Sequence, residues 1–168
     1  MPIAGEASLV ASLTARPPEG GGIGSGLEPA WAIEWRADLL GEPPSDGSAV
    51  FENRASIYTL RSRAEGGEGP DAPAERKQRL VGAVAAFDLV DLEANRDLES
   101  DLLARVPPER RLISWHGRAA TLAELRRRFE TMAATPARWY KLIPHAEKPS
   151  DGIEALALLD ALGRDDVI

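Results

Sequence analysis

The sequence has 168 residues, a net charge of −7 and no cysteine. This is the length of one domain, which can bury about two thirds of its unfolded surface. The negative charge disfavours non-specific binding to nucleic acid or an anionic membrane. The lack of cysteine excludes disulfides and thiolate nucleophiles. With only two histidines, His116 and His145, we also expect no dedicated zinc site.

The first residues lack the basic and then apolar pattern of a signal peptide. No apolar run approaches the ~20 residues needed to span a bilayer. We therefore expect a cytoplasmic protein of the ordinary globular class.

Short apolar segments alternate with amphipathic ones along most of the chain, which predicts strands alternating with helices. Such strands are typical of a parallel sheet that is covered on both faces. The expected strands are Leu9–Thr14, Ala32–Ala37, Ser56–Arg61, Phe87–Glu93, Arg111–His116 and Trp139–Ile143. The expected helices are Ala74–Ala86, Arg96–Ala104, Thr121–Ala133 and Ser150–Leu162. The third helix opens with a capping-box pattern, Thr121 to Glu124, and Gly163 is a candidate C-cap of the fourth.

The first two connections between strands differ from the others. "RPPEGGGIGSGLEPA" and "LGEPPSDGSAVFENRA" are rich in Gly and Pro, which predicts loops or eroded crossover helices. The whole pattern predicts one α/β domain over residues 1–168 with a mostly parallel sheet, open or closed into a barrel. The final "DVI" resembles the first residues of another strand, so we expect the chain to be a fragment.

Polar side chains concentrate toward the C-terminal ends of the expected strands. Residues two apart on a strand point to the same side, so each of two charged pairs shares one face. In a barrel that face is the interior, where charged groups near the top are functional candidates. The residues are Glu34 and Arg36, Arg61, Asp91 and Glu93, His116 and Lys141.

Each of these residues also has a structural interpretation. Glu34 and Arg36 could form an ion pair, and His116 could be a satisfied histidine at a strand end. Lys141 could extend from an edge strand to water. The segment "EGGEGP" could be only a turn, and "GGGIGSG" lacks the strand-to-helix context of a dinucleotide-binding fingerprint.

Together, however, a lysine on one strand and a histidine ending the preceding strand are what a Schiff-base enzyme needs. The lysine must be neutral to attack a carbonyl, and an apolar setting with neighbouring cations favours the neutral amine. A histidine can move the proton that the iminium acidifies. Nearby Arg and Glu side chains can hold an anionic, polyhydroxylated substrate.

These motifs resemble those of type I 3-dehydroquinate dehydratase, a shikimate-pathway enzyme with a (β/α)8 TIM barrel. "EWRADLL" is similar to that family's E-W-R-x-D, and "YTLRSRAEGG" to its T-x-R-x-x-x-E-G-G. "DLVDLE", "SWHG" and "YKLIP" resemble the motifs of its strands four, five and six. "LVASLT" resembles the first strand, with Ser12 at the position of an active-site serine. The resemblance covers about residues 8–168.

The resemblance implies a mechanism and a set of site residues. Lys141 would form an iminium with the C3 ketone of 3-dehydroquinate, and His116 would remove the C2 proton and then protonate the departing C1 hydroxyl. Glu65 would orient His116. Substrate contacts would come from Ser12, Glu34, Arg36 and Arg61. The family needs no metal and no organic cofactor, and it is usually a homodimer.

The sequence also departs from the family. Gly117-Arg118 stands where Asp or Asn and then Phe are common, and the chain stops near the start of strand seven. The last two strands, with a carboxylate-binding arginine and a lid loop, have no counterpart, which predicts an incomplete barrel. Two alternatives therefore stay open: a catalytically impaired barrel fragment that acts as a partner-binding or structural module, and another Schiff-base lyase of the aldolase kind. A homodimer, or a missing C-terminal segment, could complete the barrel.

Overall fold

The structure is a computed structural model that describes residues 9–16, 29–43, 51, 54–119, 121–148 and 151–168. Most of the two Gly- and Pro-rich connections lies outside these residues. The chain divides into two compact units, Met1–Val90 and Asp91–Ile168. In the described residues, six strands follow one another in the sheet in chain order. The predicted parallel α/β architecture is therefore confirmed.

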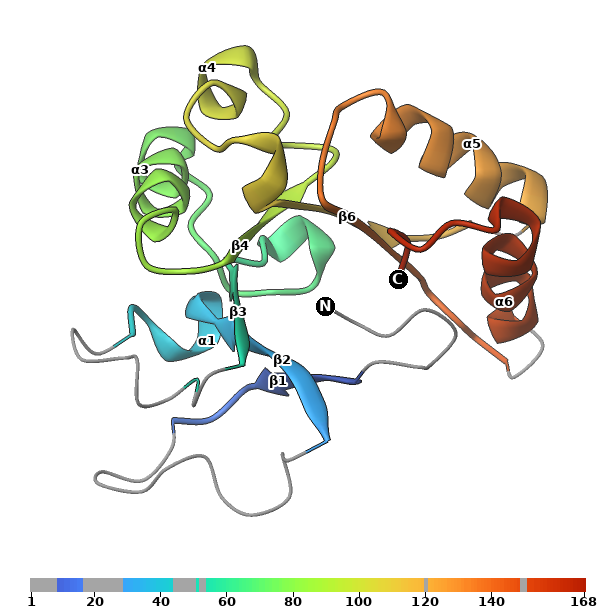
Figure 1. The fold of residues 1–168 in the computed structure, drawn as a ribbon, viewed down its shortest axis with the longest axis horizontal. Coiled ribbons are helices and arrows are strands. Elements are labelled where there is room, and N and C mark those ends of the chain that lie inside the picture. The colour runs from blue at the N-terminus through green and yellow to red at the C-terminus, as the bar shows by residue number, and fades with distance from the viewer. Residues whose placement is uncertain (1–8, 17–28, 44–50, 52–53, 120, 149–150) are drawn as a thin grey trace. The chain divides into compact units, whose positions relative to one another are not determined.

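The first unit is built on parallel strands β1 (Leu9–Leu13), β2 (Ala30–Arg36) and β3 (Ala55–Thr59). The start of β4 (Leu89–Glu93) pairs with β3. Its helical segments, shown in Figure 1, are α1 (Ala37–Leu40), the 3-10 turn η1 (Arg63–Glu65) and α3 (Pro73–Ala83). Proline at the first position of α3 suits a helix start, where its missing N–H has no intrahelical partner.

The second unit contains the end of β4, then β5 (Arg111–Gly117) and β6 (Trp139–Pro144), which pair in parallel. Its helical segments are α4 (Ser100–Leu103), the 3-10 turn η2 (Pro108–Arg110), α5 (Leu122–Ala133) and α6 (Asp151–Leu162). The last residues lie along β6: Val167 bridges Tyr140 in parallel, and the Ile168 N–H donates to the Tyr140 carbonyl at 2.8 Å. The prediction that "DVI" begins another strand is confirmed.

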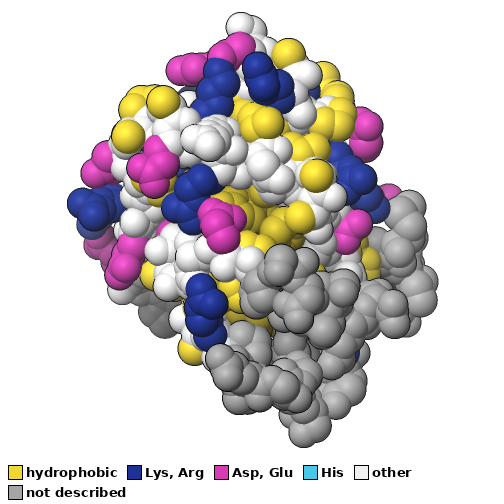
Figure 2. All heavy atoms as spheres, turned by 90° about the vertical axis from the view of Figure 1, so that its left-hand side faces the viewer, with side chains coloured by type: hydrophobic (Ala, Val, Ile, Leu, Met, Phe, Trp, Pro, Cys, Tyr) yellow, Lys and Arg dark blue, Asp and Glu magenta, His cyan; other side chains and the backbone are white. Residues whose placement is uncertain are grey.

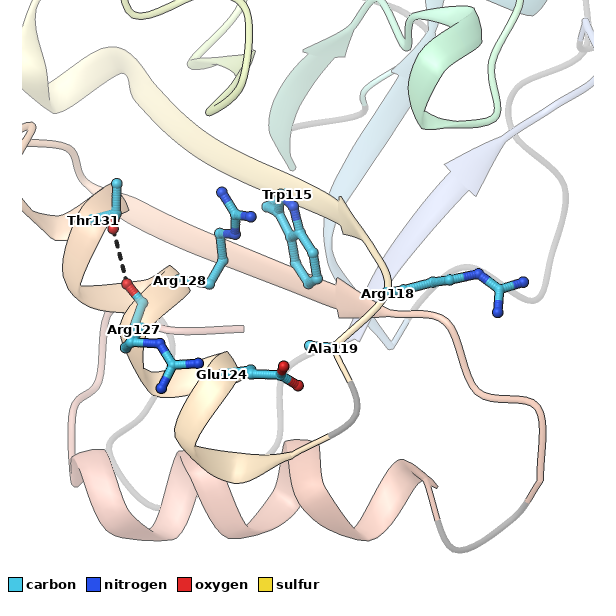
Figure 3. A pocket seen from close by; sticks show the side chains of 7 residues that line it. All are labelled: Trp115, Arg118, Ala119, Glu124, Arg127, Arg128 and Thr131. Carbon is cyan, nitrogen blue, oxygen red and sulfur yellow. Dashed lines mark hydrogen bonds between the residues drawn. The ribbon is translucent and has the colours of Figure 1, made fainter.

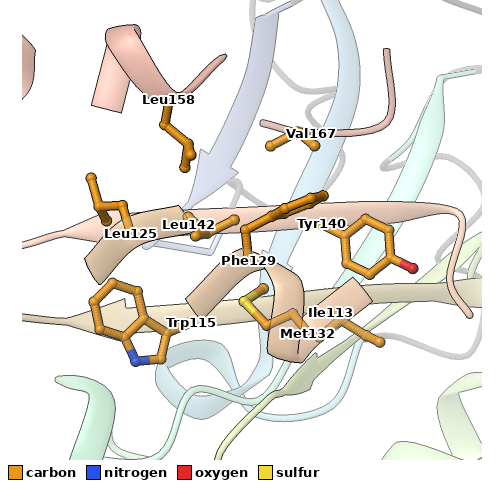
Figure 4. Close-up of a cluster of buried hydrophobic side chains, with 9 residues drawn as sticks. All are labelled: Ile113, Trp115, Leu125, Phe129, Met132, Tyr140, Leu142, Leu158 and Val167. Carbon is orange, nitrogen blue, oxygen red and sulfur yellow. The ribbon is translucent and has the colours of Figure 1, made fainter. Parts of the chain in front are cut away.

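A buried apolar cluster joins one face of β5 and β6 to α5 and α6 (Figure 4). The phenyl ring of Phe129 meets the ring of Tyr140 edge to face, with centroids 5.7 Å apart. Because strand residues alternate between faces, the opposite face of β5 and β6 carries the residues between those of the cluster. The cluster consists of Ile113, Trp115, Leu125, Phe129, Met132, Tyr140, Leu142, Leu158 and Val167.

Local signals set the ends of the two long helices of this unit. The Thr121 hydroxyl accepts from the Glu124 N–H at 3.3 Å, and the Glu124 carboxylate accepts from the Thr121 N–H at 3.1 Å, so the predicted capping box is confirmed. Gly163 has φ +55° and donates its N–H to the Leu159 carbonyl at 3.1 Å. It ends α6 as predicted.

The structure differs from prediction at two short helices. The helix expected over Arg96–Ala104 is confined to Ser100–Leu103. Its first residues form a turn, in which the Asp97 carboxylate accepts the Glu93 N–H at 2.8 Å, and this bond competes with helix formation. The sequence also gave no warning of α1, which begins directly after β2.

Charges and apolar groups are mixed on the surface. Figure 2 shows a face on which basic and acidic side chains alternate with hydrophobic ones. In the described ranges, no helix has both the length and the apolar character needed to cross a membrane.

Candidate active site

Glu34 lies at the centre of a hydrogen-bonded network in the first unit. Ser12 of β1 donates its hydroxyl to Glu34 Oε2, and Thr59 of β3 donates its Oγ1 hydroxyl to Glu34 Oε1 at 2.7 Å. The carboxylate is buried, with Glu34 only 4% exposed. Hydroxyl donors from both neighbouring strands therefore fix its orientation. Thr59 was not predicted as a site residue, although it belongs to the "YTLR" motif.

Arg36 makes a bidentate pair with Asp38, from Nε at 2.8 Å and from Nη2 at 2.7 Å. The hydrogen bond to Asp38 raises the pKa of Arg36. Burial alone would raise the pKa of Asp38, but the bonds from Arg36 and from the Glu68 N–H lower it overall. The structure thus gives Arg36 a bidentate partner, Asp38, that the structural interpretation of the sequence did not name, and the charge of Glu34 also raises the pKa of Arg36.

Arg61 and Glu65 form a second buried ion pair, with Nη1 and Oε2 3.1 Å apart and both side chains about 95% covered. Glu65 is the last residue of η1. β3 ends at Thr59, so Arg61 lies two residues beyond the strand that the sequence predicted it to end. The ion pair fixes its guanidinium group relative to η1.

The glycines of "EGGEG" allow the loop to fold tightly onto Arg61. The Gly69 N–H donates to the Arg61 carbonyl at 2.8 Å. A Cβ at Gly67 would lie 2.3 Å from the same oxygen, and Gly66 has φ +85°. Only glycine meets both demands without strain. The segment therefore has a structural role beyond reversing the chain, because its backbone binds and packs against the backbone of Arg61.

Lys141 and His116 lie on the same face of neighbouring strands in the second unit. Lys141 is the register partner of Ser114, and His116 follows Ser114 by two residues. This face is opposite the apolar cluster, and both side chains are half-buried. β6 is the last strand in the order of the sheet, and Val167 makes an isolated parallel bridge to Tyr140 on its outer side. That Lys141 extends from an edge strand to water stays an alternative interpretation.

Two buried polar residues accompany them on this face. Ser114 donates its hydroxyl to Asp91 Oδ1, and the two residues are 0% and 2% exposed. Glu93, two residues after Asp91, is also buried. The sequence singled out Asp91 and Glu93 but not Ser114, whose only signal is its place in "SWHG".

The unusual Gly117-Arg118 pair has a structural explanation. The Trp115 indole covers Gly117 so closely that a Cβ would lie 2.6 Å from the ring. Arg118 pairs with Glu147 and is mostly exposed. Figure 3 shows its side chain pointing away from Trp115, and Arg118 is one of three arginines that line a pocket beside β5 and α5. Pro144 is the register partner of Gly117 at the end of β6, and the His145 N–H donates to the Gly117 carbonyl at 2.8 Å.

The predicted site residues are thus divided between the units. Ser12, Glu34, Arg36, Arg61 and Glu65 belong to the first, and His116 and Lys141 to the second. That Glu65 orients His116 stays a prediction. Within the part of the chain that the structure describes, no three His, Cys, Asp or Glu side chains gather as a metal site would require.

The strand order and the parallel pairing of the strands define an α/β protein of the barrel type. The model of the family described as Type I 3-dehydroquinase matches residues 28–165. The chain belongs to the type I 3-dehydroquinase family. It is 34% identical over 135 residues to the 3-dehydroquinate dehydratases of two Dehalococcoides mccartyi strains, BAV1 and CBDB1. The match covers 78% of this chain and 60% of theirs, so the chain spans about three fifths of the length of these relatives.

Solved structures agree on the fold. Type I 3-dehydroquinate dehydratase from Clostridium difficile gives a TM-score of 0.69 at 17% identity, over 83% of this chain and 64% of that one. The 3-dehydroquinate dehydratase from Enterococcus faecalis gives 0.68 at 18% identity, over 91% and 72%. The predicted TIM-barrel type, in an incomplete form, is confirmed.

Proposed function

We propose that the protein is a hydro-lyase that dehydrates 3-dehydroquinate to 3-dehydroshikimate in the cytoplasm, as a step of the shikimate pathway. The observation that carries this proposal is the placement of Lys141 and His116 on one face of neighbouring strands, in a chain of this family. Ordinary dehydration needs a way to stabilise a carbanion beside a ketone, and a lysine imine supplies it.

Lys141 attacks the C3 ketone as a neutral amine, and loss of water gives an iminium. His116 removes the C2 proton, and the C–H electrons move into the iminium as an enamine. The enamine expels the C1 hydroxyl, which leaves as water when His116 returns the proton. Hydrolysis of the new iminium releases the product and restores Lys141.

We assign substrate contacts to Glu34, Arg36, Arg61 and Ser12, and the orientation of His116 to Glu65. The networks of the first unit support this assignment, because they hold Glu34, Arg36 and Arg61 in fixed positions before substrate arrives. The residues act as one partial barrel domain over 1–168, without a metal or organic cofactor. A second copy, or a further segment of chain, completes the barrel.

Two measurements test the proposal. Formation of 3-dehydroshikimate is followed by its ultraviolet absorbance, and borohydride traps the substrate adduct, which peptide mass spectrometry then locates. Lys141→Ala should lower turnover by about a thousandfold or more and abolish the adduct. Lys148→Ala, on the loop that follows β6, is the matched control and should keep both. Absence of product together with absence of an adduct at Lys141 would reject the proposal.

One observation favours the second candidate, a catalytically impaired fragment that binds a partner. The outer side of α6 exposes Ile153 by 63% and Leu156 by 67%, although apolar helix faces are normally covered. Sedimentation of the protein and of Leu156→Glu shows whether this side mediates association. A monomer with full turnover would argue against this candidate.

A further inference from the structure

A buried carboxylate of the second unit lies on the same sheet face as Lys141. Ser114 is the register partner of Lys141 on β5, and its hydroxyl donates to Asp91 Oδ1 on β4. A side-chain hydrogen bond between neighbouring strands requires both side chains on one face, so Asp91 shares the face of Lys141. Asp91 is 2% exposed and Ser114 is fully buried. The serine hydroxyl therefore fixes the carboxylate on β4, with β5 between it and the lysine strand β6.

The charges on this face are few. Of the residues that β4, β5 and β6 place on this face, Lys141 carries the basic side chain and Asp91 and Glu93 carry the carboxylates. His116 is the remaining titratable group of these strands on this face. A charge interaction is strong where water is excluded. A buried carboxylate therefore stabilises a positive charge that forms nearby, including the charge of a protonated imine.

We propose that Asp91, held by Ser114, is a positioning residue that keeps an imine at Lys141 in its protonated form. The proposal rests on the proposed function only in taking Lys141 as the imine-forming lysine. A protonated imine accepts the electrons of a neighbouring C–H bond far better than a neutral imine does. Asp91 thus sets how effective an electron acceptor the adduct becomes, without touching the substrate.

The protonation state of an imine can be observed directly with an aromatic aldehyde. 4-(Dimethylamino)benzaldehyde condenses with an amine, losing water, and its protonated imine absorbs at longer wavelength than the neutral one. The parent chain for the experiment is the full sequence with Lys77→Arg and Lys148→Arg. These two substitutions leave Lys141 as the single lysine of the sequence. Lys141→Arg identifies the band that arises from Lys141.

We expect a long-wavelength band in the parent chain. Asp91→Asn keeps an acceptor for Ser114 but removes the charge, and should lower the protonated fraction by about tenfold, the effect of a one-unit change in titration midpoint. Ser114→Ala, which frees the carboxylate, should give about a threefold loss, and Ser114→Thr should restore the band because it keeps the hydroxyl. Glu93→Gln removes the other carboxylate of this face, two residues from Asp91 on the same strand, and should lower the band less than Asp91→Asn does.

Identical spectra for the parent and Asp91→Asn would overturn the proposal, as would a change confined to Glu93→Gln. Circular dichroism reports folding of each variant. If Asp91→Asn does not fold, the comparison of Ser114→Ala with Ser114→Thr decides, and equal bands in that pair reject the proposal. The probe needs no 3-dehydroquinate, so an intact band without turnover would reject the proposed function alone.

Discussion

The two units hold their motif residues in different ways. In the first unit, side chains from successive strands bind one another: Ser12 and Thr59 hold Glu34, and Arg61 pairs with Glu65. In the second unit, an apolar cluster under α5 and α6 fixes β5 and β6 from one face and leaves the other face to the polar residues. Polar networks position individual groups, whereas apolar packing positions whole strands. The variants below test this contrast.

The largest effect should come from the apolar cluster of the second unit. Phe129→Ala removes a ring that is 4% exposed and packs against Tyr140. We expect a loss of about 3–5 kcal/mol in the free energy of unfolding, because a cavity replaces the ring. Urea denaturation followed by circular dichroism measures it.

Arg126→Ala, on the same helix, is the control. Arg126 forms an exposed pair with Glu130 at 3.3 Å, which is worth about 0.3–0.5 kcal/mol. Hydrogen exchange should show faster exchange of β5 and β6 peptides in the Phe129 variant only. Equal losses for the two variants would contradict the role given to the cluster.

The next effect concerns the ion pairs. Asp38→Asn removes the carboxylate that receives two bonds from Arg36, and we expect a loss of about 1.5–3 kcal/mol at pH 7. The pKa of Asp38 is lower in the folded protein than in the unfolded chain. The stabilisation is therefore complete above the unfolded value of about 3.9 and is lost as pH falls through the folded value. Unfolding curves of the parent protein and of Asp38→Asn, recorded at pH 7 and below pH 4, should show that their free energies of unfolding differ less in acid.

Asp166 is the matched residue of the second unit. Its pKa is lowered by the hydrogen bond from Arg164, but that pair is partly exposed. Asp166→Asn should cost only about 0.2–1 kcal/mol. A larger loss at Asp166 than at Asp38 would reverse the contrast between the units.

The last pair of variants concerns glycines of the first unit. Gly67→Ala places a Cβ against the Arg61 carbonyl, and should cost about 1–3 kcal/mol because backbone must shift. Gly82→Ala, in α3 with open space around it, should instead stabilise by about 0.5–1 kcal/mol. Thermal unfolding of the two variants measures whether each substitution lowers or raises the stability of the protein. A stabilising Gly67→Ala would show that the loop does not need its close approach to Arg61.

Much of this fold could be predicted from local patterns. The six strands lie where apolar segments of strand length occur, and Thr121 and Gly163 mark helix ends through bonds made within one turn. The helix expected at Arg96 failed because Asp97 bonds to the Glu93 backbone, a competition that periodicity does not reveal. Strand position singled out Lys141 and His116 as candidates, but their roles came from the resemblance, since no local rule distinguishes a catalytic lysine from a structural one.

By itself, the sequence determined the alternation of strands and helices, the family, and the side of each strand on which Lys141, His116 and Glu34 lie. These features depend on residue spacing along one strand or helix. Only the tertiary structure decided that Ser12 and Thr59 hold Glu34, that Asp38 holds Arg36, and that Ser114 joins Asp91. Most of these partners are 22 to 25 residues apart. Their pairing depends on strand register, which forms only when the sheet assembles.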